Sequence, residues 1–323
     1  MDNKSPNTLS YNREGNILIC GHETKYTIFK LVPKLEKHTE TNMDRIIKKI
    51  RILDNTNMIL VLYTNLNTKI SNNVVLWDDS FKKNLVEINL KDDIKNIFIV
   101  RNNLIFILEK MVCVFDYKGN LKFSHNTYCN ELGIACASNN LISTLGEIKG
   151  TIVLMDCDNN YNVNNNRIIK AHNNNIQHIT FNDDETLIAT ASEMGTNIHV
   201  FDMNTKELKY KLRRGINKAK INSISFNFEN TLLACSSNSK TVHVFKLEDN
   251  KVSNTLMSFM SVPDYFNTSN TMNWSFSQIQ IDEKNVIKFS KDGTLNIVTL
   301  NGSYYKTSHK TNYMNVIRKD LHL

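Results

Sequence analysis

Two adjacent arginines, Arg213 and Arg214, are the residues of this sequence best suited to binding chemistry. They lie in the segment Lys211-Leu212-Arg213-Arg214-Gly215, which is typical of a strand end. Because side chains alternate along a strand, the two guanidinium groups are expected on opposite sides of the backbone. A guanidinium group holds phosphate oxygens through two parallel hydrogen bonds. One short motif can therefore serve two anion pockets, although composition alone also allows a solvated basic strand end.

Seven similar strands along the chain must position this motif. Each is a short alternating segment that ends in an aromatic or apolar residue, followed by aspartate in four copies, at 26–29, 74–78, 112–116, 151–156, 197–202, 242–245 and 295–298. Their spacing, roughly 40 to 50 residues, is the size of a four-stranded propeller blade. Such short strands bury their inner faces only where blades stack around a central channel.

The repeat predicts an all-β protein: a single seven-bladed β-propeller of the WD-repeat type, with residues 1–323 as one domain. The expected blades are approximately 9–50, 51–92, 93–128, 132–170, 174–215, 220–270 and 273–312. The first and last blades are expected to close the ring, because an open end leaves an unpaired edge. A β-sandwich is the alternative fold, and seven units at blade spacing argue against it.

Composition limits the function class. With 41% hydrophobic and 22% charged residues, the chain is typical of a soluble globular protein. It has no apolar run of membrane-spanning length and no N-terminal signal sequence, so a cytoplasmic protein is expected. The net charge of +7 suits an anionic membrane surface or nucleic acid. Most of the basic residues are dispersed, which argues against nucleic acid.

The six cysteines show neither a zinc-site nor a disulfide pattern. They are Cys20, Cys113, Cys129, Cys136, Cys157 and Cys235, and all are expected to be buried thiols in a reducing compartment. The sequence also lacks a Gly-rich phosphate loop, an H-E-x-x-H motif and a G-x-S-x-G motif. We therefore expect no enzyme activity, no catalytic residue, no metal and no cofactor.

Several segments resemble one family. The run Lys211 to Gly215 is similar to the F/L-R-R-G motif of the PROPPINs, WD-repeat-like propellers that bind phosphoinositides. The other matching segments are 188–196 and 233–237 with 241–245, and, as landmarks of blades two and seven, 74–79, 274–276 and 302–306. The resemblance implies binding of phosphatidylinositol 3-phosphate and 3,5-bisphosphate on autophagic and endolysosomal membranes. It also implies autophagy partners: a lipid-transfer protein and the machinery that conjugates ubiquitin-like membrane tags.

The resemblance also implies the residues of the two rim pockets. In the first, Arg213 is expected with Ser192, Thr196 and His172. In the second, Arg214 is expected with Ser236, Ser237, Thr241 and His243. Hydroxyl and imidazole groups supply short-range donors there, and arginine supplies permanent charge. We expect binding to strengthen mildly near pH 6 through protonation of His172, His199 or His243.

An apolar segment after the blade-six strand lies where the family has a membrane-inserting loop. Its candidate side chains are Leu256, Met257, Phe259, Met260 and Val262. The same segment is equally compatible with an outer strand packed on blade six. Insertion would add to headgroup binding multivalently, in a monomer attached peripherally to autophagosomal, endosomal or vacuolar membranes.

Two departures from the family pattern keep a second function open. His199 stands where members often carry arginine, and Lys240 replaces the usual glycine before Thr241. The alternative is therefore a WD-repeat scaffold that assembles proteins without binding lipid.

Overall fold

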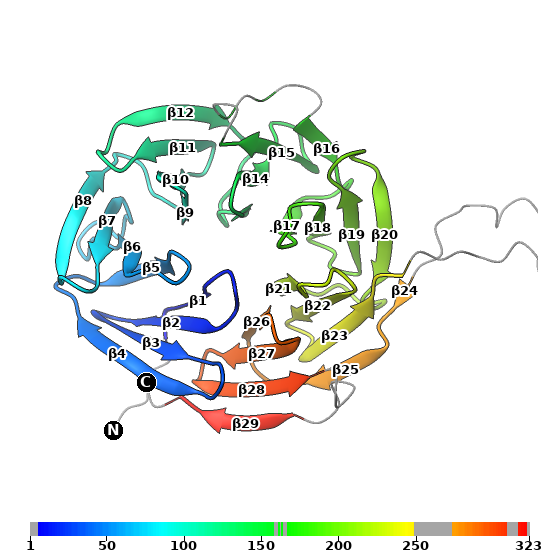
Figure 1. The fold of residues 1–323 in the computed structure, drawn as a ribbon. Helices are drawn as coiled ribbons and strands as arrows, with labels where there is room; N and C mark the ends of the chain where they lie inside the picture. Colours follow the sequence, from blue (N-terminus) through cyan, green and yellow to red (C-terminus); the bar gives the residue numbers. More distant parts are fainter. Residues whose placement is uncertain are drawn as a thin grey trace, which may run out of the picture.

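Seven β-sheets surround a central channel in the computed structural model, which describes residues 6–157, 161, 163, 167–248, 273–308 and 316–321. The sheets follow one another around the ring in chain order, each running from an inner strand to an outer one (Figure 1). The expected seven-bladed β-propeller is therefore confirmed. None of the described residues belongs to a helix with the length and apolar character needed to span a bilayer.

The strands of each sheet have the following bounds. The first three sheets contain β1 (Thr8–Tyr11), β2 (Ile17–His22), β3 (Lys25–Lys30), β4 (Glu36–Asn42); β5 (Ile47–Ile52), β6 (Met58–Tyr63), β7 (Asn73–Asp78), β8 (Lys83–Asn89); and β9 (Asn96–Val100), β10 (Asn103–Ile107), β11 (Met111–Asp116), β12 (Leu121–Asn126). The fourth and fifth contain β13 (Ala135–Ala137), β14 (Leu141–Leu145), β15 (Thr151–Asp156), β16 (Ile168–Lys170); and β17 (Ile176–Phe181), β18 (Leu187–Ser192), β19 (Asn197–Asp202), β20 (Leu208–Arg213), β24 (Asn273–Trp274). The last two contain β21 (Ile221–Phe226), β22 (Leu232–Ser237), β23 (Thr241–Lys246), β25 (Ser277–Gln280); and β26 (Asn285–Phe289), β27 (Thr294–Thr299), β28 (Ser303–Ser308), β29 (Ile317–Asp320).

Position within a blade explains the composition of its strands. A middle strand is covered on both faces by neighbouring blades, so it is mostly apolar, and β10 is buried at every residue. The outer strand of the same blade, β12, is half-buried or exposed along its whole length and carries lysine, serine and histidine. The inner strand alternates, because every second side chain faces the channel, as in β26.

The ring closes by side-chain packing. Each of seven hydrophobic clusters among the described residues lies between two adjacent blades. The cluster that joins the first blade to the seventh contains Leu18 and Phe29 on one side and Val298 and Tyr304 on the other. The hydroxyl of Ser290 also donates a 3.0 Å hydrogen bond to the carbonyl of Gly15.

Three strands lie in other blades than their sequence positions suggest. β5 opens the second blade, since Ile47 and Ile50 pack between blades one and two. β25 completes the sixth blade by pairing with β23, although residues from 273 onward were expected in the seventh. Trp274 lies in β24, which pairs in parallel with β20 at the edge of the fifth blade. Sequence order hides these last two placements, because the strands follow a long interval after β23.

Candidate functional site

The two motif arginines contact different blades. Arg213 ends β20 opposite Asn197, and its Nη1 donates a 3.1 Å hydrogen bond to Oδ1 of Asn197 in the same blade. The backbone N–H of Arg214 donates to the carbonyl of Thr196 at 2.9 Å. Its side chain instead reaches the sixth blade, where Nη1 donates to Oγ of Ser239 at 3.3 Å. Strand alternation thus separates the two guanidinium groups, as the sequence predicts.

A surface cavity of about 290 Å³ lies beside Arg213 on the fifth blade. Its walls bring together His172, Ser192 and Thr196, the residues expected in the first pocket. Arg213 does not line this cavity, but it donates a hydrogen bond to Asn197, which does. The other lining residues are Lys170, Ala171, Asn173, Asn174, Met194, His199 and Lys211.

Lys211 is a cation of the cavity wall that the sequence analysis did not select. It lies opposite His199 in the β19–β20 pair, two residues before Arg213. Period-two alternation places Lys211 and Arg213 on the same face of β20, so the spacing could have identified it. Lys211 supplies the fixed charge that His199, in place of the family's arginine, does not.

Two imidazole rings form one wall of the cavity. The rings of His172 and His199 stack with centroids 4.3 Å apart and an interplanar angle of 14°. Nε2 of His172 lies 2.9 Å from Oγ1 of Thr190, and Nδ1 of His199 lies 2.9 Å from the carbonyl of Ala171. A carbonyl only accepts, so Nδ1 of His199 carries a proton and donates it. The rings are fixed by these bonds before any ligand arrives.

Burial argues against the expected protonation of His172 and His243 near pH 6 in the free protein. Burial, reinforced by the neighbouring His199, lowers the pKa of His172 to about 3. Burial also lowers the pKa of His199. Burial and the charge of Arg214 lower the pKa of His243 to about 4. Removing a ring from water disfavours its charged form, so His172 and His243 are neutral at pH 6.

Arg214 is an internal cation with only 6% of its surface exposed. Its Nε donates to the carbonyl of Gly195 at 2.9 Å, and Nη2 donates to the carbonyl of Asn217. These acceptors and the Ser239 hydroxyl are neutral, and no described carboxylate forms an ion pair with Arg214. Burial and the charge of Arg213 lower the pKa of Arg214. A buried guanidinium without an acidic partner keeps its positive field and favours a nearby anion.

Gly195 shapes the turn that holds Arg214. Its φ of +58° lies in the left-handed region that favours glycine, and an added Cβ would lie 1.9 Å from the carbonyl oxygen of Ala219. Only glycine leaves room for this approach of the fifth and sixth blades. The Gly195 carbonyl is thereby placed to accept from Arg214.

The serines expected around Arg214 lie below the surface. Ser236 is 0% exposed and Ser237 2% exposed, and Oγ of Ser236 has no hydrogen-bond partner among the described residues. Oγ of Ser237 lies 2.6 Å from Oγ of Ser239, the hydroxyl that Arg214 contacts. The Thr241 hydroxyl donates to the Ser239 carbonyl at 3.4 Å. Ser239, which the sequence analysis missed, therefore links Arg214 to this cluster.

His243 is held by a residue that lies between β24 and β25. Its Nδ1 lies 3.0 Å from Oγ of Ser275, which follows β24 directly. In β24, Trp274 pairs with Arg213 and is 60% exposed. The same short segment therefore flanks Arg213 and supports His243. The expected membrane-inserting residues Leu256, Met257, Phe259, Met260 and Val262 lie outside the described residues.

Lys240 occupies a left-handed turn. Its φ of +65° explains why glycine is usual at this position, since a side chain is strained there. The Nζ atom of Lys240 is 3.9 Å from Oδ1 of Asp282, and both side chains are exposed. The lysine therefore lies on the surface beside Thr241 and contributes a screened charge to this edge of the blade.

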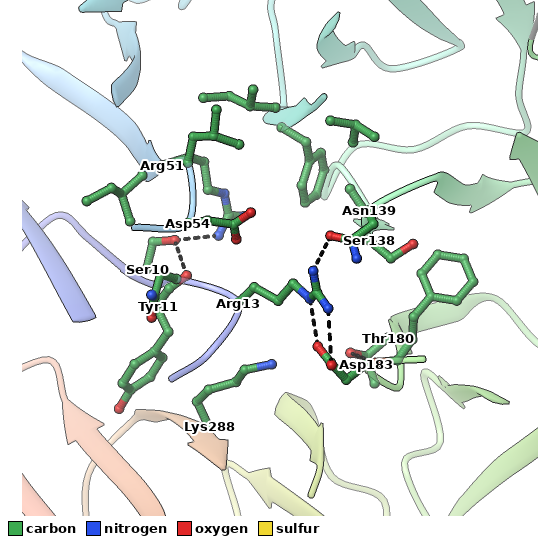
Figure 2. Close-up of a pocket in the computed structure, with 18 of the residues that line it drawn as sticks. Ser10, Tyr11, Arg13, Arg51, Asp54, Ser138, Asn139, Thr180, Asp183 and Lys288 are labelled. Atoms are coloured by element: carbon green, nitrogen blue, oxygen red, sulfur yellow. Dashed lines mark hydrogen bonds and ion pairs between the residues drawn. The ribbon is translucent and has the colours of Figure 1, made fainter. Parts of the chain in front are cut away.

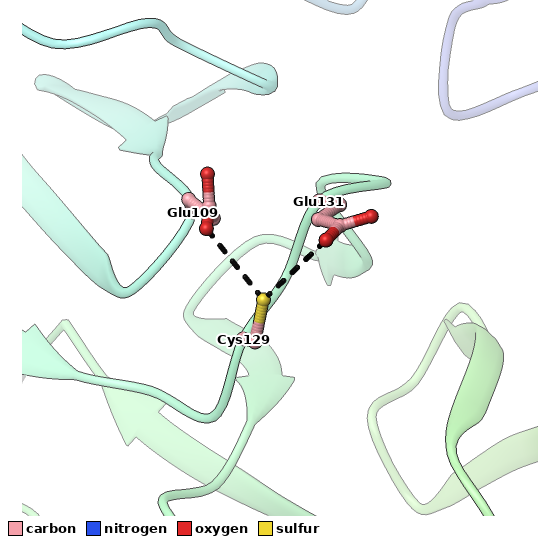
Figure 3. A group of neighbouring side chains, drawn as sticks. All are labelled: Glu109, Cys129 and Glu131. Carbon is pink, nitrogen blue, oxygen red and sulfur yellow. Dashed lines mark hydrogen bonds between the residues drawn. The ribbon is translucent and has the colours of Figure 1, made fainter.

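Two cysteines contradict the expectation that all six are buried. Cys129 is exposed, and Cys157 is half-buried. The Cys129 thiol lies between two carboxylates, 3.6 Å from Glu109 and 3.9 Å from Glu131 (Figure 3). Cys129 follows an outer strand and lies in a loop, where no neighbouring blade covers it. Reduced hydration and the charge of Glu109 raise its pKa, so it is a poor nucleophile.

Comparison with known proteins assigns the chain to one family. The PROPPIN family model matches residues 6–266, which include Arg213, Arg214 and all the pocket residues that the sequence predicts. The chain belongs to the PROPPIN family. It is 28% identical to SVP1-like protein 2 of Pichia angusta over 295 residues, covering 85% of this chain and 80% of that protein. It is 27% identical to Autophagy-related protein 18 of Caenorhabditis elegans over 266 residues, covering 76% of this PROPPIN and 61% of that relative.

Solved structures of similar fold cover nearly the whole PROPPIN chain. Kluyveromyces lactis Hsv2 matches with a TM-score of 0.78 at 20% identity, covering 98% of this chain and 99% of that one. The complex of KlAtg21 with the coiled-coil of AgAtg16 matches with a TM-score of 0.77 at 22% identity, with the same coverage, 98% and 99%. At this identity the match establishes the propeller fold alone.

Proposed function

We propose that this PROPPIN is a peripheral membrane effector that binds phosphatidylinositol 3-phosphate and phosphatidylinositol 3,5-bisphosphate. The headgroups occupy two rim clusters that share the motif Leu212-Arg213-Arg214-Gly215. The first is the fifth-blade cavity beside Arg213, and the second is the group of sixth-blade side chains that Ser239 links to Arg214. The observation that carries the proposal is the pair of adjacent arginines without an acidic partner among the described residues: Arg213 bonds to Asn197, and Arg214 bonds to neutral oxygens. Each of these unneutralised guanidinium groups, one directed to the fifth blade and the other to the sixth, favours a phosphate-bearing headgroup.

The fifth-blade cavity has the chemistry for a phosphorylated sugar. Its volume of about 290 Å³ is near the lower end of small-ligand pockets. Lys211 supplies charge, and the hydroxyls of Ser192 and Thr196 supply donors for phosphate and inositol oxygens. His172 acts as a neutral hydrogen-bonding wall, because it is uncharged at cytoplasmic pH.

Recruitment of autophagy machinery is the second half of the function. A relative is named Autophagy-related protein 18, and a propeller of the same fold was solved with a coiled-coil of AgAtg16. The proposed partners are a lipid-transfer protein and the machinery that conjugates ubiquitin-like tags. The protein works as a cytoplasmic monomer attached to autophagosomal, endosomal or vacuolar membranes. It binds and assembles; it catalyses no reaction and binds no nucleic acid.

A scaffold without lipid recognition is the second candidate, and one observation favours it. Arg214 already donates to Gly195, Asn217 and Ser239, so its guanidinium is structurally engaged. In that function, Arg214 fastens the turns of blades five and six and carries no ligand.

Liposome flotation separates the two functions. Vesicles of phosphatidylcholine alone, or with phosphatidylinositol 3-phosphate or the 3,5-bisphosphate, are mixed with wild type, Arg213→Ala, Arg214→Ala and the double variant. The wild type is expected to float only with the phosphoinositides, and the double variant with none. Arg318→Ala is the matched control, because Arg318 is an exposed arginine on β29 in the seventh blade.

Equal flotation of wild type and double variant rejects the arginine site. Absence of wild-type flotation on either phosphoinositide favours the scaffold. Circular dichroism and melting of each variant show whether a loss of binding reflects unfolding.

A further inference from the structure

A cavity of about 630 Å³ occupies one mouth of the central channel, away from the rim clusters. Its wall takes residues from the inner strands or adjoining turns of all seven blades, from Ser10 in the first to Lys288 in the last (Figure 2). Small-molecule pockets in proteins are of this size. No function above uses this cavity.

Inner-strand alternation carries cations into the channel. In β5, Ile47 and Ile50 are buried between blades, while Lys49 and Arg51 are half-buried. In β26, Ile287 and Phe289 are buried, and Lys288 takes the alternate position. Arg51 and Lys288 both line the cavity. Because these positions alternate with buried positions in the same strands, the fold itself directs both charges inward.

Among the residues that the structure describes, Arg51 has neutral partners only. Its guanidinium donates to the carbonyl of Ile97 at 3.3 Å, to Oγ of Ser10 at 3.1 Å and to Oδ1 of Asn96 at 3.2 Å, and it covers the ring of Phe98 at 5.0 Å. Burial lowers the pKa of Arg51 to about 10. These bonds fix the cation in place but leave its charge uncompensated.

Lys288 has no ion pair or hydrogen bond among the described residues. The acid that acts on its charge, Asp183, is held in a bidentate pair by Arg13, with Nε–Oδ1 and Nη2–Oδ2 distances of 2.6 and 3.1 Å. Burial lowers the pKa of Lys288, the Asp183 charge opposes this shift, and the Arg13 charge adds to it. Its ammonium group therefore faces the cavity without a partner that would satisfy its donors.

The charged residues that line the cavity are Arg13, Arg51, Arg101 and Lys288 against Asp54 and Asp183, which leaves a net positive charge. We propose that the channel mouth is a second anion site, which binds a small phosphate-bearing molecule between Arg51 and Lys288. Guanidinium and ammonium groups are the side chains that proteins use for phosphate. An anion would compensate the charge of both cations in a partly desolvated space.

Isothermal titration calorimetry with inorganic pyrophosphate tests the proposal on the full chain. The wild type is expected to bind, and Lys288→Gln to bind at least fivefold more weakly. Lys288→Arg keeps the charge and is expected to stay within threefold of wild type. The Arg213→Ala/Arg214→Ala variant is expected to match wild type, because its changes lie on the rim.

Inositol 1,3-bisphosphate as a second ligand separates a lipid headgroup from a free phosphate. If binding of this headgroup depends on Lys288, the headgroup binds in the channel.

Melting with and without pyrophosphate is the second measurement, because a ligand that binds only the folded state raises the melting temperature. The shift is expected in wild type and absent in Lys288→Gln. The proposal is overturned if wild type shows no heat with millimolar pyrophosphate or if Lys288→Gln binds as tightly as wild type. Loss of binding in the rim variant also overturns it, since the anion would then lie at the rim.

Discussion

Arg13 of the first blade donates two hydrogen bonds, 2.6 and 3.1 Å long, to the carboxylate of Asp183 in the fifth blade, across the channel mouth (Figure 2). The pair joins elements 170 residues apart in sequence. An ion pair across the channel therefore holds the ring together in addition to the apolar packing between blades.

Removing this ion pair should lower the stability of the fold only slightly. Both side chains are partly exposed, 37% for Arg13 and 26% for Asp183, so solvent screens the pair. We expect Asp183→Asn to lower the free energy of unfolding by about 1 kcal/mol or less. A double-mutant cycle with Arg13→Gln, measured by urea denaturation, should give a coupling energy of the same size. Coupling above about 3 kcal/mol would contradict this assignment.

Acid should destabilise the fold through its buried histidines. Burial lowers the pKa of His172 to about 3 and those of His178 and His243 to about 4. In the unfolded chain a histidine titrates near 6.5, so between about pH 6.5 and pH 4 only the unfolded state takes up protons. Stability is therefore complete above pH 6.5 and falls as pH falls, by up to about 1.4 kcal/mol per pH unit for each histidine.

Urea denaturation at pH 7.5, 6 and 5 measures this slope. Replacing the internal His178 by Gln should reduce it, whereas His38→Gln, at an exposed position in β4, should not. An unchanged slope in the His178 variant would mean that its ring is already accessible to protons. Because His172 and His243 stay neutral, liposome binding should be flat between pH 8 and pH 6.

Arg213 and Arg214 should differ in their effect on stability. Arg214→Ala leaves the carbonyl of the buried Gly195 without its donor and also removes the bond to the exposed Asn217, which should cost about 1 to 3 kcal/mol. Arg213→Ala removes one partly exposed contact with Asn197 and should cost less than about 0.5 kcal/mol. Thermal melts of the two single variants provide the comparison, and equal losses would argue against the buried role of Arg214.

Relief of backbone strain should stabilise one turn. Lys240→Gly removes a side chain at φ +65° and should raise the free energy of unfolding by up to about 1 kcal/mol. Asn230→Gly is the matched control, because Asn230 has a φ of +57° but asparagine tolerates that region. A smaller gain for Asn230→Gly is expected. If Lys240→Gly melts lower than wild type, the Lys240–Asp282 contact outweighs the strain.

The propeller could be predicted from the sequence because middle strands covered on both faces need nearly continuous apolar runs at blade spacing. The family resemblance grouped His172, Ser192 and Thr196 with Arg213, and the structure brings the first three together at one cavity that Arg213 does not line. Blade membership after β23 could not be predicted, because a strand's partner depends on spatial neighbours and β25 returns from a distant part of the chain.

The partners of each arginine were also beyond the sequence. Arg214 bonds to two backbone carbonyls and to Ser239, and a carbonyl carries no residue-type signal. Ser275 supports His243 from 32 residues away. The pair of channel cations could not be predicted from the sequence either, because Arg51 and Lys288 line the same cavity only when the second and seventh blades surround one axis.

The late arrival of β25 has a consequence for biosynthesis. A ribosome adds roughly 5 to 20 residues per second, so β23 emerges several seconds before the strand that pairs with it. During that interval the edge of β23 has unpaired backbone groups, which can recruit another chain. A nascent or truncated polypeptide that stops before Ser277 exposes this edge next to Arg214 and is prone to aggregate.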